Sequence, residues 1–486
     1  MQRELLRVMD GIVGRTKVQN DLEKLFKSGK SELLIVYGRR RVGKTHLIRK
    51  YFEGRFAFYT TGMYEASQEQ QLEQFATTLG EYQKTKLATP RTWIEAFAML
   101  KAYLLKSRMR RKVVFFDEIP WYDTPGSGFL PAFEAFWNGW GAGRDDLLLI
   151  VCGSATTWIT NKLLANKGGL FNRATSQIYL EPFTLYETEQ FLKSKGIVWS
   201  RYDITECYMV MGGIPYYLQQ LDPRKSYMEN IDEMFFQKNC KLKDEFRHLY
   251  NTLFSNSEYY IRIVELLSSK NIGLTREELV KTGNFQNNGY LTEALRNLET
   301  SDFVRAYNYY GKKKKNITYQ LCDFYSMFYF RFIRQQYGRD EHFWSHSIDL
   351  PQRRAWAGYM FEQVCYWHVP QIKQSLGISG ILSEQSAWYE HKADEALTSR
   401  GAQIDMIIAR RDRVISLCEM KFSVGRFVID SDYEMSLRDK LTAFRSHTLK
   451  SNALQIVMIS TFGVKPNAHS GIVQSEVLMD DLYKEI

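Results

Sequence analysis

The segment Gly38–Thr45, with the sequence GRRRVGKT, has the residue types and spacing of a phosphate-binding loop. It follows the apolar run LLIVY and precedes a helical pattern, as such a loop requires. Gly38 and Gly43 let the backbone turn its N–H groups toward phosphate oxygens. Lys44 would reach the β- and γ-phosphates, and Thr45 would ligate Mg²⁺. The loop therefore predicts a site for ATP with Mg²⁺.

Two acids at the end of a later apolar run could complete this chemistry. The run VVFFDE ends in Asp117 and Glu118, about 70 residues beyond the loop. At the end of a buried strand, Asp117 would hold the Mg²⁺ shell and Glu118 would polarise the attacking water. The pair alone could also be a helix N-cap. Because both motifs occur in the right order, we favour the nucleotide site.

Two further polar residues are candidates with open alternatives. The run LLLIVCGSA carries Ser154 at its end, where the hydroxyl could sense the γ-phosphate or belong to a Gly-Ser turn. Arg173 precedes another strand-like run and could neutralise charge on the γ-phosphate in cis or in trans. The competing interpretation of Arg173 is a surface arginine.

A second constellation lies near the carboxyl end of the chain. Asp405 stands in an apolar run, an RRDR turn follows, and a second run ends with Glu419 and Lys421. Two carboxylates on adjacent strands can hold Mg²⁺, and a lysine two residues after the second one points to the same face. This arrangement resembles the PD-(D/E)-x-K nuclease core. An upstream helical pattern offers Glu362, which would complete a metal site with Asp405 and Glu419.

The alternative for this constellation is a relic cluster of ion pairs on a degenerate nuclease fold. Because the carboxylates and the lysine are all present, we favour an intact metal site that acts on DNA.

The elements that must position these residues fall into four predicted segments. Residues 1–185 alternate apolar runs with helical periods, which is typical of a parallel α/β sheet in a P-loop ATPase core. Residues 186–254 are predicted to be a helical lid, and residues 255–335 a winged helix that begins one helix with a Thr-x-x-Glu capping box. Residues 340–486 return to an α/β pattern, that of the nuclease-like domain.

The predicted winged helix offers mixed signals for nucleic-acid binding. The run Lys312–Lys315 occupies the expected wing turn, where it could contact phosphates or simply be solvated. Arg296 in the would-be recognition helix is flanked by Glu293 and Glu299, which argues against base reading in the major groove. We expect weak sequence specificity. The aromatic run at residues 323–337 is expected to be a packed helix.

Composition sets the remaining bounds. The chain has 486 residues, a net charge of +10 and a pI near 9.0, which suits either a polyanionic partner or a basic, solvated surface. Its six cysteines are scattered without a metal-ligand pattern, so we expect reduced thiols, no zinc site and a cytoplasmic location. No apolar run is long enough to predict a membrane span.

Taken together, the segments VGR, GRRRVGKT, FFDEIPW, CGSA, LFNRATSQIYLEPF and GGIPYYL resemble the archaeal-type AAA+ ATPases, relatives of the STAND NTPases. The resemblance implies a winged helix and a restriction-type nuclease domain after the ATPase core. It also implies that Gly14 and Arg15 lie against the adenine, and that Pro215 belongs to a lid turn that closes over the nucleotide. The lid shows no clear second sensor arginine, and the sequence leaves a homo-oligomer open.

Our leading expectation is an ATPase whose nucleotide state controls a Mg²⁺-dependent nuclease-like domain acting on DNA. A STAND-like switch with a catalytically silent C-terminal domain is the alternative, and a plain DNA-binding regulator lacks base-reading side chains. The arginines Arg39–Arg41 occupy variable positions of the loop, where a solvated face is favoured over contact with DNA or a neighbouring domain.

Overall fold

The computed structural model describes residues 11–154, 156–164, 173–311, 317–336, 339–389 and 403–486. The chain divides into two compact units. Unit 1 runs to Pro182 and includes Ile214–Tyr216, whereas unit 2 holds Phe183–Gly213 and Tyr217–Ile486. Among the described helices, none is both long enough and apolar enough to cross a membrane.

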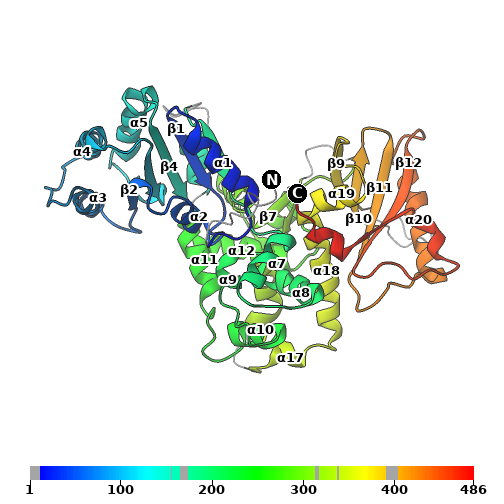
Figure 1. Ribbon diagram of the computed structural model, residues 1–486. Coiled ribbons are helices and arrows are strands. Elements are labelled where there is room, and N and C mark those ends of the chain that lie inside the picture. Colours follow the sequence, from blue (N-terminus) through cyan, green and yellow to red (C-terminus); the bar gives the residue numbers. More distant parts are fainter. Residues whose placement is uncertain (1–10, 155, 165–172, 312–316, 337–338, 390–402) are drawn as a thin grey trace. The chain divides into compact units, whose positions relative to one another are not determined.

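Unit 1 is built on a five-stranded sheet with the order β2-β3-β4-β1-β5 (Figure 1). Every neighbouring pair in this sheet is parallel. Its strands are β1 (Glu32–Tyr37), β2 (Phe56–Thr61), β3 (Lys112–Asp117), β4 (Leu147–Gly153) and β5 (Ser176–Tyr179). The central strands β3 and β4 are buried at every residue, which explains their unbroken apolar sequences.

Helices cover both faces of this sheet. They are α1 (Thr16–Lys27), α2 (Lys44–Tyr51), α3 (Gln68–Gln83), α4 (Trp93–Lys106) and α5 (Phe129–Gly139), with the short segments η1 (Ile119–Trp121), η2 (Gly141–Gly143), α6 (Thr156–Trp158) and η3 (Ile159–Leu164). Side chains of α3, α4 and α5 share one core with alternate residues of β1, β3 and β4. In Figure 1, α1 and α2 lie on the other side of the sheet. Unit 1 is therefore the α/β P-loop core that the alternating pattern predicts.

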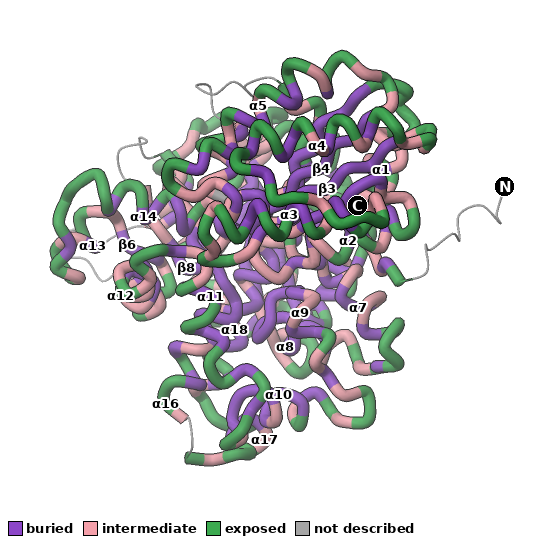
Figure 2. The backbone as a smooth tube through the Cα atoms, turned by 90° about the vertical axis from the view of Figure 1, so that its left-hand side faces the viewer, coloured by how far each residue is buried: buried purple, intermediate pink, exposed green. Residues whose placement is uncertain are grey.

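The first half of unit 2 is helical. Its helices are α7 (Leu185–Ser194), α8 (Arg201–Met211), α9 (Pro215–Leu218, which begins in unit 1), α10 (Tyr227–Phe235) and α11 (Glu245–Leu253). Residues 204–211 of α8 are all buried, and Figure 2 shows this helix within the interior. Because even Thr205 and Glu206 are buried, this part of the helix has neighbours around its whole circumference.

A small three-stranded sheet with the order β6-β8-β7 follows in unit 2. Its elements are α12 (Ser257–Ser268), β6 (Leu274–Thr275), α13 (Arg276–Gly283), α14 (Gly289–Thr300), β7 (Val304–Tyr307) and β8 (Thr318–Leu321). Thr275 and Glu278 form the predicted capping box at the start of α13. The run Lys312–Lys315 lies outside the described residues.

The aromatic run forms a chain of short, mostly buried helices, namely α15 (Phe324–Phe328), the π-helical η4 (Tyr329–Ile333) and α16 (Arg334–Gln336). The predicted packed helix is therefore interrupted by a wider turn. Next come α17 (Phe343–His346), α18 (Pro351–Trp367) and α19 (Val369–Ser375).

Unit 2 ends in a five-stranded mixed sheet with the order β13-β12-β11-β10-β9. Its elements are β9 (Ser383–Tyr389), β10 (Gln403–Arg410), β11 (Val414–Lys421), α20 (Ser431–Arg445), β12 (Ala453–Ser460), η5 (Ser470–Ile472), β13 (Ser475–Leu478) and η6 (Met479–Tyr483). Strands β9, β10 and β11 pair antiparallel, while β11, β12 and β13 pair in parallel. Helix α20 makes the crossover from β11 to β12 and packs on the core of the sheet.

The six cysteines are free and buried, as the sequence predicts. They are Cys152, Cys207, Cys240, Cys322, Cys365 and Cys418.

Candidate functional site

The phosphate loop joins the end of β1 to the start of α2, and glycine is required at Gly38 and at Gly43 for different structural reasons. Gly38 has φ +140°, and a Cβ at this position would lie 2.5 Å from the carbonyl oxygen of Leu180. Gly43 has φ +89° and is the N-cap of α2. Both positions favour glycine because other residues rarely adopt these conformations.

Lys44 lies folded into this loop. Its side chain is buried, and its Nζ donates hydrogen bonds to the carbonyl oxygens of Gly38 at 2.9 Å and Arg39 at 2.8 Å. Burial lowers the pKa of Lys44, and the acidic groups of Cys152, Glu118 and Asp117 oppose this shift. A phosphate placed here would give the ammonium a charged acceptor, and such hydrogen bonds are stronger than neutral ones.

Asp117 and Thr45 meet beside Lys44. The hydroxyl of Thr45 donates to Asp117 Oδ1 at 3.1 Å, and Asp117 is buried at the end of β3. Burial, with the nearby charge of Glu118, raises the pKa of Asp117 to about 6. The strand register also brings Cys152 of β4 next to Asp117, and the two side chains hydrogen-bond. A hydroxyl and a carboxylate side by side fit Mg²⁺, which prefers such oxygen ligands.

Glu118 and Ser154 form the second contact of this site. The Ser154 hydroxyl donates to Glu118 Oε1 at 2.7 Å, and its backbone N–H donates to Oε2 at 3.1 Å. Glu118 has φ +46°, a left-handed conformation that non-glycine residues rarely adopt and that often marks functional sites. Ser154 thus holds the carboxylate of Glu118, and its contact with the γ-phosphate stays a prediction.

Gly14 and Arg15 precede α1 and adjoin the loop. Arg15 is the N-cap of α1, is buried, and donates from a guanidinium nitrogen to the carbonyl oxygen of Val42 at 3.5 Å. Gln19 donates to the carbonyl oxygen of Gly14 at 2.7 Å. The structure thus brings the segment before α1 against the phosphate loop.

Pro215 begins α9, and its neighbour Tyr216 carries a contact that the sequence did not reveal. The guanidinium of Arg41 lies over the ring of Tyr216, 4.1 Å from its centroid. Arg41 itself has φ +72°. Arg41 of the triple-arginine run therefore contacts the segment 214–216. The predicted solvated loop face is wrong for this arginine.

Arg173 is exposed at the opposite end of the sheet. β5 runs parallel to β1, with Ser176 opposite Leu34 and Tyr179 opposite Tyr37. Arg173 precedes the amino end of β5, whereas the loop follows the carboxyl end of β1, so at least about 13 Å of strand separates them. This distance exceeds an arginine side chain, which excludes the predicted role in cis.

The C-terminal constellation is assembled on one face of its sheet. The register pairs Met406 with Cys418, which places Asp405 opposite Glu419. Lys421 follows on the same face of β11 because side chains alternate along a strand. The pairing of β10 with β9 shifts by one residue just after Ile404, so Asp405 lies in a β-bulge. Bulges re-aim side chains beside active sites.

Two residues that sequence reasoning missed engage Glu419. Lys440 Nζ lies 2.6 Å from Glu419 Oε1, and the Tyr433 hydroxyl donates to Oε2 at 3.3 Å. Both come from α20, and Lys421 Nζ lies 5.2 Å from the centre of the Tyr433 ring. The spacing of Tyr433, Leu437 and Lys440 matches one helix face, which is the signal that could have revealed them.

Glu362 joins this cluster from α18. Burial, reinforced by the charge of Asp405, raises the pKa of Glu362 well above its usual range, while Lys421 opposes the shift. The pKa of Glu419 is also raised, first by burial and then by Asp405, against Lys440 and Lys421. Each carboxylate therefore disfavours the charged form of the others, as happens in cation-binding sites without their cation.

Even so, the cluster is not arranged as a metal site. Within the described ranges, no group of three or more His, Cys, Asp or Glu side chains could hold a metal ion. Lys440 supplies Glu419 with the positive charge that a metal ion would otherwise provide. Glu362, Asp405 and Glu419 would have to rearrange to bind Mg²⁺ together.

Comparison with known proteins supports a nucleotide site at the phosphate loop. Residues 12–221 match a family described as an ATPase domain predominantly from Archaea. This segment, which is similar to archaeal-type ATPase domains, contains the phosphate loop and the acids of β3.

Particular relatives extend this comparison. Over 434 residues the chain is 23% identical to an uncharacterized protein of Methanocaldococcus jannaschii, covering 88% of this chain and 90% of that protein. A shorter match, to an uncharacterized ATP-binding protein of the same archaeon, has 46% identity over 43 residues. It covers 9% of this chain and 73% of that protein.

Solved structures give weaker likenesses. The Walker-type ATPase of Pyrococcus abyssi aligns with a TM-score of 0.47 and 17% identity over 66% of this chain and 96% of that one. The ORC2 protein of Aeropyrum pernix, in complexes with ADPNP and ADP, aligns with a TM-score of 0.41 and 12% identity over 74% of this chain and 97% of that one.

Proposed function

We propose that this protein binds and hydrolyses ATP with Mg²⁺, and that its nucleotide state controls a nuclease-like domain acting on DNA. The ATPase part is supported above all by the buried Lys44, which is held by loop carbonyls beside the Thr45–Asp117 pair. We assign residues 186–254 to a lid, 255–335 to a winged helix and 340–486 to the nuclease-like domain.

In the ATPase reaction, the side chains of unit 1 would divide the work. Lys44 and the loop N–H groups would bind the phosphates, and Glu118, oriented by Ser154, would accept the proton of the attacking water. Thr45 and Asp117 would hold Mg²⁺, which would neutralise phosphate charge. Gly14 and Arg15 would contact the adenine.

Segment 214–216 is the proposed link to unit 2. It belongs to unit 1, yet the chain on both sides of it belongs to unit 2. Because Arg41 of the phosphate loop stacks on Tyr216, a change in the loop on ATP binding would displace this segment. Pro215 would thereby take part in lid closure.

For the nuclease part, the support is the shared face of Asp405, Glu419 and Lys421, with Glu362 from α18. The carboxylates would hold Mg²⁺ after rearrangement, and Lys421 would orient water or stabilise the scissile phosphate. DNA is thus the proposed partner and the cytoplasm the proposed location. In a homo-oligomer, Arg173 would act on the nucleotide of a neighbouring copy.

The deciding experiment incubates supercoiled and linear DNA with the protein and Mg²⁺ or Mn²⁺, with and without ATP. Wild type should cut, and Asp405→Ala should not. DNA that stays intact under all conditions, or an Asp405→Ala variant that cuts as well as wild type, rejects the nuclease. Separately, Lys44→Ala should lose ATP binding in a filter-binding assay; retained affinity would reject the phosphate-loop assignment.

One observation favours a second candidate function, a regulatory ATP switch with a silent C-terminal domain. Glu419 is already paired with Lys440, as a relic of a metal site would be. This candidate predicts slow ATP turnover and no cleavage of DNA under any of the conditions above.

A further inference from the structure

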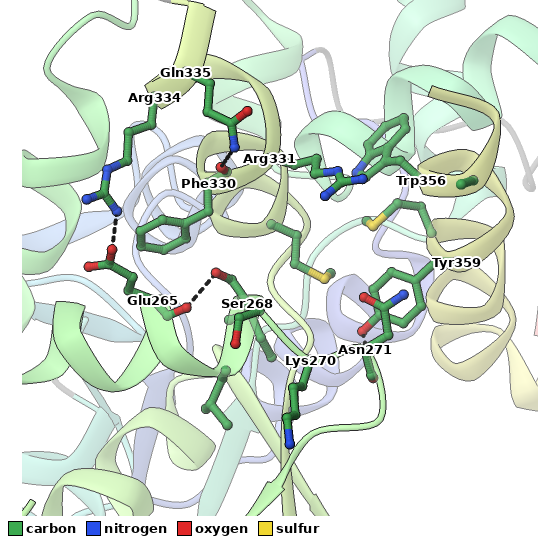
Figure 3. Close-up of a pocket in the computed structure, with 16 residues that line it drawn as sticks. Glu265, Ser268, Lys270, Asn271, Phe330, Arg331, Arg334, Gln335, Trp356 and Tyr359 are labelled. Carbon is green, nitrogen blue, oxygen red and sulfur yellow. Dashed lines mark hydrogen bonds and ion pairs between the residues drawn. The ribbon is translucent and has the colours of Figure 1, made fainter. Parts of the chain in front are cut away.

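A cavity of about 610 Å³ lies in unit 2 (Figure 3). It is bounded by α12, by η4 with α16, and by α18. Figure 3 shows Arg334 and Gln335 at one side, Arg331 extending toward Trp356, Asn271 beside Tyr359, and Lys270 at the base. The polar end of the aromatic run therefore forms part of a binding-sized hollow.

Two smaller cavities, of about 380 Å³ and 40 Å³, adjoin this one. All three share Asn271 and Tyr359 in their walls. Glu362 lines both smaller cavities, Lys421 lines the larger of the two, and Asp405 lines the smaller. We call the three adjoining cavities the α18 groove. The two smaller ones are lined by residues of the carboxylate cluster.

Helix α18 forms one wall of the α18 groove along its length. Ala355, Tyr359, Glu362 and Tyr366 line it in turn, at the spacing of a single helix face. From Ala355 to Glu362 the helix rises about 10 Å. A chain lying along this face would pass from the wide cavity to Glu362.

Positive charge gathers at the wide end of the α18 groove. Lys270 and Arg331 are exposed there, and within the described ranges neither forms an ion pair. Arg334 is paired with Glu265, as Figure 3 shows. Two cations are thus available to an anionic ligand in the large cavity, whose lining includes neither Glu362 nor Asp405.

Aromatic and apolar side chains line the same end. Phe330, Trp356 and Tyr359 line this end with Leu321, Met327 and Met360. Phe330 and Trp356 are buried, whereas Tyr359 is partly exposed and presents a ring on which a base can stack beside the cations, as in sites for single-stranded nucleic acid.

We propose that the α18 groove binds a single strand of DNA and leads its phosphodiester backbone to the carboxylate cluster. The proposal rests on the proposed nuclease function and narrows its substrate to unpaired strands or ends. The cavity volume suits unstacked nucleotides and is in the range of small-ligand pockets, far below what a duplex would fill. Lys270 and Arg331 bind phosphates ahead of the cluster.

The test is fluorescence anisotropy with a labelled oligothymidylate about 12 nucleotides long, in EDTA and without ATP. Wild type should bind, and the double variant Lys270→Glu, Arg331→Glu should bind at least about tenfold more weakly. Its slope of log affinity against log salt should fall by about 1.4, because each single-strand phosphate contact contributes about 0.7. The matched control, Lys86→Glu with Arg91→Glu, reverses two exposed charges of unit 1 and should bind like wild type.

Three results would overturn the proposal. The double variant could bind like wild type, a blunt duplex of the same length could bind as tightly as the single strand, or thymidine monophosphate could compete as well as the oligonucleotide. The two proposals also fail separately. Binding that depends on Lys270 and Arg331 without any cleavage rejects only the nuclease, whereas cleavage that the double variant leaves unchanged rejects only the α18 groove.

Discussion

Asp117 and Glu118 are neighbours in sequence but meet different surroundings. Asp117 ends a fully buried strand, whereas Glu118 turns out of it in a left-handed conformation and receives two hydrogen bonds from Ser154. The strand buries one carboxylate where a cation would bind, and the turn presents the other for proton transfer. Single substitutions can separate these roles.

Asp117→Asn should stabilise the nucleotide-free protein at neutral pH. In the wild type, the folded-state pKa of Asp117 is about 6, above the ordinary 3.8. The contribution of this carboxyl group to stability is therefore present below pH 3.8 and lost as pH rises through 6. At pH 7.5 the buried charge costs up to about 3 kcal/mol, which the amide removes. Urea unfolding of unit 1 should show this gain at pH 7.5 and its disappearance near pH 4.

The same variant should fail to hydrolyse ATP, because an amide is a poor Mg²⁺ ligand. Asp123→Asn is a suitable control, since Asp123 follows η1 outside the site and bonds to Trp158. A stability gain for Asp117→Asn that is equal at pH 4 and pH 7.5 would contradict the raised pKa.

Lys440→Met should convert the C-terminal cluster into a better metal site. It removes the ammonium that lies 2.6 Å from Glu419 and leaves that buried carboxylate without its ion pair. We expect Mn²⁺ affinity at this cluster to rise by about tenfold, or 1.4 kcal/mol, by isothermal titration calorimetry without nucleotide. Lys450→Met, at an exposed position, should leave the affinity unchanged.

Asp405→Asn in the Lys440→Met background should abolish the added Mn²⁺ binding. If Lys440→Met binds no more Mn²⁺ than wild type, the cluster is a relic ion-pair network, and the silent-domain alternative gains.

At the scale of elements, close packing of β1 and β5 determines the shape of the phosphate loop. The loop begins where β1 ends, and the residue after β5, Leu180, approaches Gly38 so closely that a side chain has no room. The loop therefore depends on a strand that lies about 140 residues later in the chain. Glycine at this position is a packing requirement as well as a phosphate-binding one.

Gly38→Ala should therefore destabilise unit 1 and weaken ATP binding together. The new Cβ would meet the Leu180 carbonyl oxygen at 2.5 Å, at φ +140°, so the strand ends must separate. We expect a loss of about 3 kcal/mol in urea unfolding.

Gly54→Ala is the matched control. Gly54 also has positive φ, +72°, but a Cβ there would meet nothing within 4 Å. The loss in unfolding free energy for Gly54→Ala should therefore equal the backbone strain alone, about 1 kcal/mol. Equal losses for the two variants would show that backbone strain, and not the contact with Leu180, limits position 38.

At the scale of the whole molecule, the chain passes between the two units at Pro182, Gly213 and Tyr216. Segment 214–216 is the part of this path that contacts the phosphate loop, through Tyr216 and Arg41. Helix α8, which ends just before it, is buried throughout its second half in unit 2. A helix so enclosed moves only together with its surroundings.

Tyr216→Ala should uncouple the units while leaving ATP bound. In wild type, ATP should change amide hydrogen exchange in α8, and this change should vanish in the variant, with ATP affinity held within about threefold because a cation–π contact contributes only about 1 kcal/mol. Tyr64→Ala, at an exposed tyrosine of unit 1, should keep the response. An unchanged α8 response in Tyr216→Ala would exclude this route.

Much of the first site was predictable because its information is local. The spacing of Gly38, Gly43, Lys44 and Thr45 and the apolar run before Asp117 each lie within a few residues, and parallel strands bring their carboxyl ends to one edge. The α/β pattern of unit 1 was predictable for the same reason. Positions at strand ends, such as Arg173, were harder, because the sequence does not say which end of the sheet a loop occupies.

By itself, then, the sequence determined a P-loop ATPase core and the facing pair Asp405 and Glu419, since loop spacing and strand alternation are short-range properties. Only the tertiary structure decided that Ser154 hydrogen-bonds to Glu118, that Arg41 stacks on Tyr216, and that Lys440 forms an ion pair with Glu419. Those contacts join residues between 21 and 175 positions apart, and packing alone brings them together.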